Sequence, residues 1–237
     1  MPSIDPLEIE HFTKLADTWW DENGPFKALH QLNPLRISFI RDHIHKNFSQ
    51  ATHGLQGITI LDVGCGGGLL SEPLARMGAT VTAIDATPEN VNTAKTHAES
   101  MGLSIDYRFE AVEDHTGTYD VVVAMEIIEH VADVPSFIQS CVHRVKPGGL
   151  IFFSTINRTW KSYLLGIVAA EHVLKWVPKG THQWNKFVTP EEIKQALACN
   201  KTDILEQTGV LFDPLRNTWI ASRRDGVNYM CVGQKQS

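Results

Sequence analysis

The sequence predicts a doubly wound α/β fold, in which a seven-stranded, mostly parallel sheet is covered by helices on both faces. Strand and helix patterns alternate from residue 58 to residue 155, an order typical of parallel sheets with crossover helices. The strands in this region are apolar almost throughout, as in sheets buried on both faces. A glycine-rich turn, VGCGGG, connects the first of these strands to a helix.

Two helices are expected before this core, at residues 5–20 and 34–46, with the polar bend DENGP between them. Runs of β-forming residues predict the first five strands at residues 58–63, 80–85, 104–110, 119–125 and 150–155. Helical patterns predict helices at residues 69–77, 88–100 and 133–145. The segment VKPGG is expected to form a hairpin before the fifth strand.

A longer insertion follows the fifth strand and ends near Val188. Thr189 then suits the N-cap of a helix and Pro190 its first position, while two glutamates after it favour the helix dipole. Two further strands are expected at residues 202–210 and 227–234, which brings the sheet to seven strands.

Length and composition limit the class of protein. The 237 residues suffice for a single domain, 1–237, with residues 1–50 as an N-terminal helical extension and residues 154–188 as an insertion. The net charge of −6 argues against nucleic acid as a partner, because phosphate binding needs a basic face. The four cysteines show no CxxC spacing, which favours a reducing compartment. Neither a basic leader nor an apolar stretch of about 20 residues is found, so a cytoplasmic protein is expected.

The glycine-rich turn narrows the ligand to two cofactor classes. A dinucleotide fingerprint, G-x-G-x-x-G, would require a third glycine at the position that Leu69 occupies. The turn instead carries Asp62 followed by Gly64, Gly66 and Gly68. S-adenosylmethionine has no diphosphate, and its ammonium and sulfonium groups suit an acidic residue near the turn. This spacing therefore favours S-adenosylmethionine over a dinucleotide.

Several motifs together resemble those of class I S-adenosylmethionine-dependent methyltransferases, whose fold is Rossmann-like. They are DVGCGGG, AIDATPEN, YDVVVAMEIIEHV, and VKPGG followed by LIFFSTIN. Residues 12–36, residues 154–188 and NYM near the end resemble the ubiquinone-biosynthesis O-methyltransferase family. The segments WWD, NPLR and PKGTH are the most specific parts, and the resemblance covers nearly the whole chain.

The resemblance implies a cofactor site at the carboxyl edge of the sheet. Arg36 in NPLR would contact the carboxylate of the cofactor, although the residues alone favour a surface arginine. Asp85, at the end of the second strand, would accept hydrogen bonds from the ribose hydroxyls. Met125, at the end of the fourth strand, would line the site, and the alternative is a core methionine. Val112 and Glu113 are expected beside the adenine.

The motif MEIIEH supplies the candidate catalytic groups. A phenol with a pKa near ~10 holds little phenolate at neutral pH, so its proton has to be removed. On a helix, Glu126, Glu129 and His130 would share one face. In one interpretation His130 is a general base oriented by a carboxylate, with Glu129 as the second catalytic candidate. In the other, all three bind a divalent cation, magnesium above all, that a catechol-like substrate chelates. The structural alternative is that Glu126 caps a short helix and His130 packs under the sheet edge.

The insertion bears on how a polyprenylated substrate reaches the site. Apolar residues recur at helical spacing between Tyr163 and Val177, and Trp160 and Trp176 lie near the ends beside lysines. This pattern predicts either a lid helix or a segment that contacts an anionic membrane surface. A membrane contact would place the protein peripherally on the inner membrane, on the matrix side in a mitochondrion. A ubiquinone-biosynthesis complex is a further expected partner.

The sequence thus predicts an S-adenosylmethionine-dependent O-methyltransferase for polyprenylated phenols and catechols, of the demethylubiquinol and 2-polyprenyl-6-hydroxyphenol type. Two alternatives stay open. One is an O-methyltransferase for another small phenolic or carboxylate acceptor, and the other is a non-catalytic cofactor-binding scaffold of a biosynthetic complex.

Overall fold

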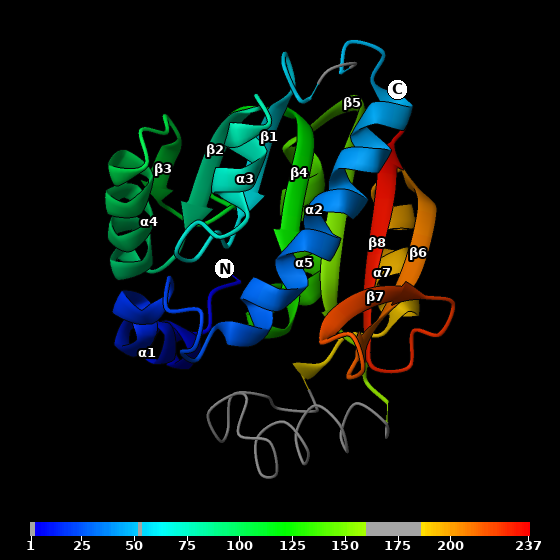
Figure 1. Cartoon of the computed structure of the whole chain (residues 1–237). Helices are drawn as coiled ribbons and strands as arrows, with labels where there is room; N and C mark the ends of the chain where they lie inside the picture. Colours follow the sequence, from blue (N-terminus) through cyan, green and yellow to red (C-terminus); the bar gives the residue numbers. More distant parts are fainter. Residues whose placement is uncertain (1–2, 52–53, 160–185) are drawn as a thin grey trace.

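The computed structural model describes residues 3–51, 54–159 and 186–237, and its centre is an eight-stranded sheet. The strands are β1 Thr59–Val63, β2 Thr80–Asp85, β3 Asp106–Phe109, β4 Tyr119–Met125, β5 Val145–Ile156, β6 Thr202–Asp213, β7 Thr218–Ser222 and β8 Asn228–Lys235. In space they follow the order β3-β2-β1-β4-β5-β8-β6-β7 (Figure 1). The first five strands in this order are parallel, and the other three are antiparallel to their neighbours.

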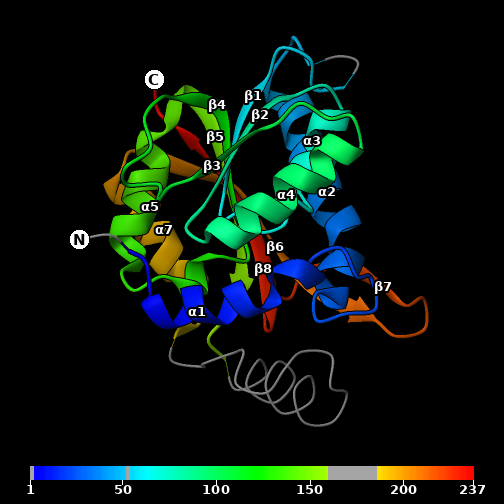
Figure 2. The same ribbon diagram turned by 90° about the vertical axis from the view of Figure 1, so that its left-hand side faces the viewer.

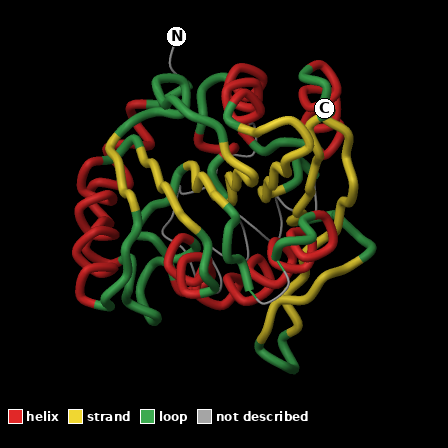
Figure 3. Tube along the Cα trace, turned by 90° about the horizontal axis from the view of Figure 1, so that it is seen from above, coloured by secondary structure: helices red, strands yellow, loops and turns green. Residues whose placement is uncertain are grey.

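Helices cover both faces of the sheet (Figures 2 and 3). They are α1 Pro6–Leu15, α2 Lys27–Asn47, α3 Ser71–Arg76, α4 Pro88–Ser100, α5 Val134–His143 and α7 Pro190–Cys199, with 3-10 turns η1 Ala16–Thr18 and η2 Ile128–His130. Successive side chains of a strand face opposite sides. Phe152 of β5 therefore packs in the cluster under α2 and α3, and Phe153 in the cluster under α5 and α7.

The predicted doubly wound α/β architecture is confirmed, with one strand more than expected. The additional strand, β7, pairs antiparallel with β6 at the edge of the sheet. Its five residues are exposed or half-buried, so it lacks the apolar run that marked the other strands. An edge strand that buries little leaves a weak signal in the sequence.

Two boundaries differ from the prediction. Helix α2 begins at Lys27 rather than residue 34, and Pro34 lies inside it. A proline inside a helix removes one hydrogen bond, but Leu32 and Ile40 on either side are buried in the core, so packing offsets the loss. The segment VKPGG is the start of β5 rather than a separate hairpin. Gly148, with φ +75°, lies where the pairing with β4 shifts register.

The helix after the insertion follows its predicted signals. Thr189 caps α7, because its hydroxyl accepts from the amide of Glu192 at 3.3 Å. The Glu192 carboxylate in turn accepts from the amide of Thr189 at 2.7 Å. This reciprocal pair is a capping box, and it fixes the start of α7.

Among the helices of the described ranges, none combines the length and the apolarity needed to cross a membrane. Residues 160–185 lie outside the described residues. The predicted lid or membrane-contact helix falls within that segment and stays a prediction.

Candidate functional site

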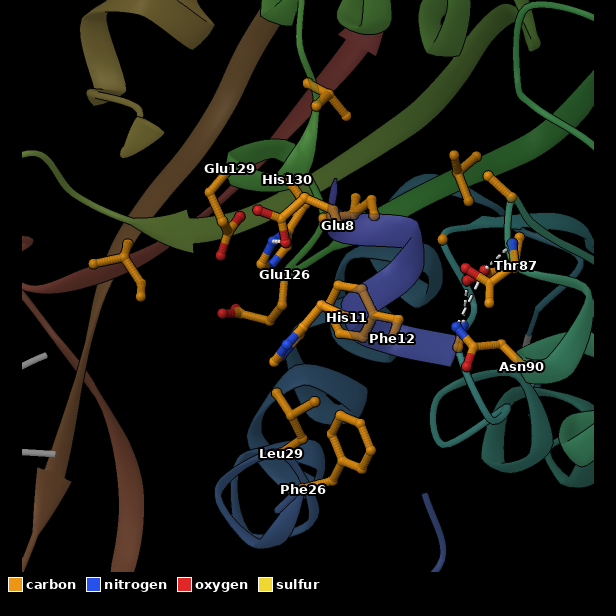
Figure 4. A pocket seen from close by; sticks show the side chains of 18 of the residues that line it. Glu8, His11, Phe12, Phe26, Leu29, Thr87, Asn90, Glu126, Glu129 and His130 are labelled. Carbon is orange, nitrogen blue, oxygen red and sulfur yellow. Dashed lines mark hydrogen bonds and ion pairs between the residues drawn. The ribbon is translucent and has the colours of Figure 1, made fainter. Parts of the chain in front are cut away.

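A cavity of about 640 Å³ lies at the carboxyl ends of the parallel strands, the edge at which doubly wound sheets bind ligands. Its wall includes Gly64 after β1, Asp85 at the end of β2 and Glu126 after β4. In Figure 4, Phe12 of α1 separates a group of acidic and imidazole side chains from Asn90 on the opposite side. The volume is within the range of cofactor and small-molecule sites.

Asp85 is held in a fixed orientation at the end of β2. Its carboxylate accepts hydrogen bonds from the amide of Gly66 at 2.9 Å, the amide of Thr87 at 2.8 Å and the side chain of Asn90 at 3.2 Å. Burial raises the pKa of Asp85, and these hydrogen bonds act in the opposite direction. A carboxylate has about four lone-pair sites, so Asp85 retains acceptor capacity toward the cavity that it lines.

The glycine-rich turn is shaped by the protein's own side chains. Gly66 has φ +52°, and a Cβ placed on it would lie 2.5 Å from the ring of Trp19. A Cβ on Gly67 would lie 2.3 Å from the Cβ of the same tryptophan. The Trp19 ring stacks on Phe26 with centroids 3.7 Å apart, and its indole N–H donates to Asn90 at 2.8 Å. The bare backbone that the sequence analysis assigned to a ligand thus also permits the close approach of Trp19.

Arg36 and Asp62 are buried, and neither is among the residues that line the cavity. Arg36 lies near the charges of Asp62 and of Glu126, and Glu126 does line the cavity. Arg36 is only 4% exposed, so it is not the surface arginine that its sequence context favoured. One of its N–H groups donates to Asn33 at 3.0 Å, and its Nε has no hydrogen-bond partner among the described residues. Burial raises the pKa of Asp62 to about 6, against the opposing effects of a 2.5 Å hydrogen bond from Ser71 and the charge of Arg36. A buried guanidinium with an unused N–H fits a carboxylate ligand, which suits S-adenosylmethionine.

Met125 is not among the residues that line the cavity, and its predicted place in the cofactor site stays a prediction. Its side chain is 6% exposed and packs in the core cluster under α2 and α3. Glu126, the next residue, lines the cavity instead, with φ +56° and with its amide donating to the carbonyl and hydroxyl oxygens of Ser154. Left-handed residues other than glycine cluster at functional sites. Val112 and Glu113 line the cavity, as expected.

The acidic and imidazole side chains of MEIIEH do not share one helical face. Glu126 lies in the left-handed turn, and only the short 3-10 turn η2 follows it. All three predicted residues line the cavity, but Glu129 accepts a hydrogen bond from the hydroxyl of Thr155 at 2.8 Å. The Nδ1 atom of His130 lies 2.9 Å from Oε2 of Glu8. The carboxylate hydrogen-bonded to the imidazole is therefore Glu8 of α1.

These groups shift one another's pKa. Burial raises the pKa of Glu129, and the charge of His130 opposes this. Burial alone would lower the pKa of His130, but the hydrogen bond with Glu8 and the nearby carboxylates raise it. Burial opposes ionisation of Glu8 as well, yet hydrogen bonds from His130 and Lys186 lower its pKa to about 2. The cavity therefore presents the imidazole of His130 beside a carboxylate that is ionised at neutral pH.

The predicted magnesium ligands do not form a ligand set as they lie. Within the described ranges, no group of three His, Cys, Asp or Glu side chains is arranged to hold a metal ion. The nearest partners of Glu129 and His130 are Thr155 and Glu8. Magnesium binding stays a prediction. Measuring activity as magnesium is added back to enzyme treated with a chelator tests it. The same magnesium dependence of activity in the Glu126→Ala/Glu129→Ala variant would exclude these two residues as ligands.

Most of the remaining wall is apolar, and several of its residues carried no signal in the sequence. Trp19 and Phe26 of the aromatic segment at 18–26 line the cavity. Trp20 of the same segment stacks on His97, with centroids 3.5 Å apart. Glu8 and the apolar residues of α1 and α2 were not predicted from the sequence, because no motif marks them. The apolar lining includes Phe12, Leu15, Trp19, Phe26, Leu29, Leu32, Ile127 and Trp219.

Comparisons with known proteins agree with this geometry. A family model described as a methyltransferase domain matches residues 29–201. The ubiquinone biosynthesis O-methyltransferase of Methylobacterium nodulans is 47% identical over 240 residues, which cover 99% of this chain and 96% of that protein. The protein of that name from Rhizobium leguminosarum is 46% identical, with the same two coverages. A magnesium protoporphyrin IX methyltransferase from Synechocystis, solved with bound SAH, has a TM-score of 0.69 at 18% identity. The match covers 97% of this chain and 98% of the Synechocystis chain, and it shows a shared fold.

Proposed function

The chain belongs to the family of ubiquinone biosynthesis O-methyltransferases, and on that premise we propose that it transfers the methyl group of S-adenosylmethionine to a phenolic oxygen of a polyprenylated phenol or catechol. The observation that supports this most is the arrangement of one cavity. Asp85 lines it, and Asn90, which donates to Asp85, lies on the other side of Phe12 from His130 and its carboxylate partner Glu8 (Figure 4). Apolar walls connect the two groups and suit a hydrophobic acceptor.

Three residues of the chain would hold the cofactor. When bound, S-adenosylmethionine supplies a methyl group that its sulfonium has already activated. Asp85 would accept hydrogen bonds from the ribose hydroxyls through its remaining lone pairs. Arg36, whose Nε has no partner among the described residues, would donate to the carboxylate of the cofactor. Asp62 would supply a negative charge for the ammonium group.

His130 would prepare the acceptor. An ordinary phenol is almost entirely protonated at neutral pH. His130 lines the cavity, and in its unprotonated form it would take the phenolic proton as a general base during methyl transfer. Positioning of the two reactants supplies the rest of the rate enhancement.

The affinity for S-adenosylhomocysteine is expected to fall as the pH drops through about 6, the pKa of Asp62 in the unliganded protein. Above this pH the ionised carboxylate attracts the ammonium group of the ligand, and below it protonation removes that attraction. The loss is at most about tenfold per pH unit. Calorimetry across this pH range measures it, with Asp62→Asn as the comparison. Equal pH dependence in both proteins would contradict the assignment of Asp62.

Transfer of a labelled methyl group from S-adenosylmethionine to a short-tail demethylubiquinol tests the function. The wild-type protein is expected to produce the labelled O-methylated quinol, with no label incorporated in the absence of acceptor. Equal or better transfer to small phenols or carboxylates without a tail would indicate another acceptor. Binding of S-adenosylhomocysteine without any transfer would indicate a cofactor-binding scaffold.

Peripheral contact with an anionic membrane surface would deliver a polyprenylated acceptor to this site. The support is the sequence pattern between Trp160 and Trp176, which lies outside the described residues. Flotation with vesicles, with and without anionic lipid, tests it. A smaller fraction of the Trp160→Ala/Trp176→Ala variant is expected to float with the vesicles. If neither the anionic lipid nor the two substitutions change the fraction that floats, the proposal is wrong. Co-purification from detergent-solubilised cells tests a ubiquinone-biosynthesis complex.

A further inference from the structure

The start of the chain is fastened to the segment that carries His130. Ile4 forms a β-bridge with Val131, and the amide of Ala132 donates to the carbonyl of Ser3 at 2.7 Å. Asp5 then caps α1, with its carboxylate accepting from the amide of Leu7 at 3.0 Å. These contacts fix the first turn of α1 against the cavity.

Glu8 lies in that first turn and meets His130. Its Oε2 is 2.9 Å from Nδ1 of the imidazole, and the two side chains are only 14% and 11% exposed. The edge of the Phe12 ring packs against the same imidazole, with centroids 5.1 Å apart and planes at 85°. In the part of the chain that the structure describes, Nε2 of His130 has no hydrogen-bond partner, and the residue lines the cavity.

Lys186 holds the other oxygen of Glu8. Its Nζ is 2.9 Å from Oε1 of Glu8 and 2.8 Å from the carboxylate of Asp5. Each oxygen of Glu8 therefore has its own partner, which fixes the plane of the carboxylate. Lys186 also offsets the charge of two neighbouring acids at the start of α1.

We propose that Glu8 is the positioning residue of the general base: it accepts the Nδ1 proton of His130 and so presents the Nε2 lone pair to the phenolic proton of the acceptor. This role rests on the proposed function. A carboxylate that accepts from one imidazole nitrogen determines the tautomer and orients the other nitrogen. Glu129 is next to His130 in the sequence and was the expected orienting carboxylate, but it accepts a hydrogen bond from Thr155 instead.

In the proposed methyl transfer, the proton passes from the phenol to His130 and one electron pair moves from oxygen to carbon as another leaves with sulfur. The phenolic O–H bond breaks and its proton forms an N–H bond at Nε2 of His130. The oxygen lone pair forms the new bond to the methyl carbon, and the carbon–sulfur pair leaves with the neutral thioether. Glu8 stabilises the imidazolium that results, without taking a proton itself.

Substitution of Glu8 tests the proposal in two independent ways. Glu8→Gln and Glu8→Ala are expected to lower kcat by roughly 10–100-fold, the range seen when the orienting partner of a functional histidine is removed. The KM for the acceptor and the Kd for S-adenosylhomocysteine are expected to stay near the wild-type values. The matched control is Glu10→Gln, two residues along the same helix, where the carboxylate is exposed and pairs with Lys14.

The second readout needs no substrate. Nitrogen-15 shifts of His130, assigned with a His130→Gln variant, are expected to show Nδ1 protonated in the resting wild-type protein and a mixture of tautomers in Glu8→Ala. Unchanged shifts in Glu8→Ala, or kcat within about twofold of the wild type in both Glu8 variants, would overturn the proposal. So would a parallel loss of cofactor affinity, because that indicates a structural role. If the wild type transfers no methyl group to any phenol, the proposed function fails, and the shifts still decide whether Glu8 sets the tautomer.

Discussion

Replacing His130 with alanine is expected to lower kcat by roughly 10²–10⁴-fold, the usual contribution of a general base. The expected loss is in kcat because the imidazole acts on the acceptor proton and makes no contact with the ribose end of the cavity. Transfer of labelled methyl groups at saturating concentrations of both substrates measures it. The Kd for S-adenosylhomocysteine, measured by calorimetry, is expected to stay near the wild-type value.

The matched control for this change is His45→Ala. His45 is exposed on α2, and its ring nitrogen contacts the carbonyl of Gly54 at 3.1 Å, away from the cavity lining. A loss in the His130 variant no larger than in the His45 variant would exclude His130 as the base. Catalysis would then rest on positioning alone.

Replacing Asp85 with asparagine is expected to weaken the binding of S-adenosylhomocysteine by roughly 10–100-fold or more, because hydrogen bonds to a charged group contribute about 1.5–3 kcal/mol. The variant keeps the shape of the side chain but loses the charged acceptor for the ribose hydroxyls. Calorimetry measures the affinity, and kcat at saturating cofactor is expected to change far less.

Asp106→Asn is the control for this substitution. Asp106 lies on the neighbouring strand β3, is half exposed and pairs with Arg108. Wild-type affinity in the Asp85 variant would place the ribose elsewhere. Binding of NAD by the wild-type protein in place of S-adenosylhomocysteine would overturn the choice of cofactor that the glycine spacing supports.

The parts of the fold that the sequence predicted well depend on signals within a few residues. Asp62 and Asp85 follow apolar runs, so their places at the ends of β1 and β2 can be read directly. Thr189 and Pro190 mark the start of α7 in the same way. Local sequence patterns therefore predicted the core strands and the edge of the sheet at which the cofactor is expected, because both depend on single strands and the turns that follow them.

The parts that were missed depend on contacts between distant segments. Glu8 and His130 are 122 positions apart, and no spacing in the sequence indicates that α1 packs on η2. The left-handed turn at Glu126 was missed because a glutamate gives no sign of positive φ. Pro34 favoured a helix start, and only the burial of its neighbours explains the longer helix.

The glycine turn shows how one pattern can have two physical causes. Its spacing distinguished the two cofactor classes, yet Gly66 and Gly67 also lie in contact with Trp19. Trp19 lies 47 positions before Gly66 and could not be connected with the turn from the sequence, although the WWD segment marked that tryptophan as part of a family-specific motif. Close packing between distant segments, unlike helix or strand periodicity, is not encoded in local spacing.

Rates with acceptors of graded acidity test whether the phenolic proton passes to His130 as the methyl group is transferred. Methyl transfer by the wild type and by His130→Ala would be measured with phenols bearing increasingly electron-withdrawing substituents. The wild-type rate is expected to vary little, whereas the rate of the variant is expected to rise as the phenol pKa falls and to approach the wild type for the most acidic acceptors. The same dependence on phenol pKa in both proteins would contradict proton transfer to His130.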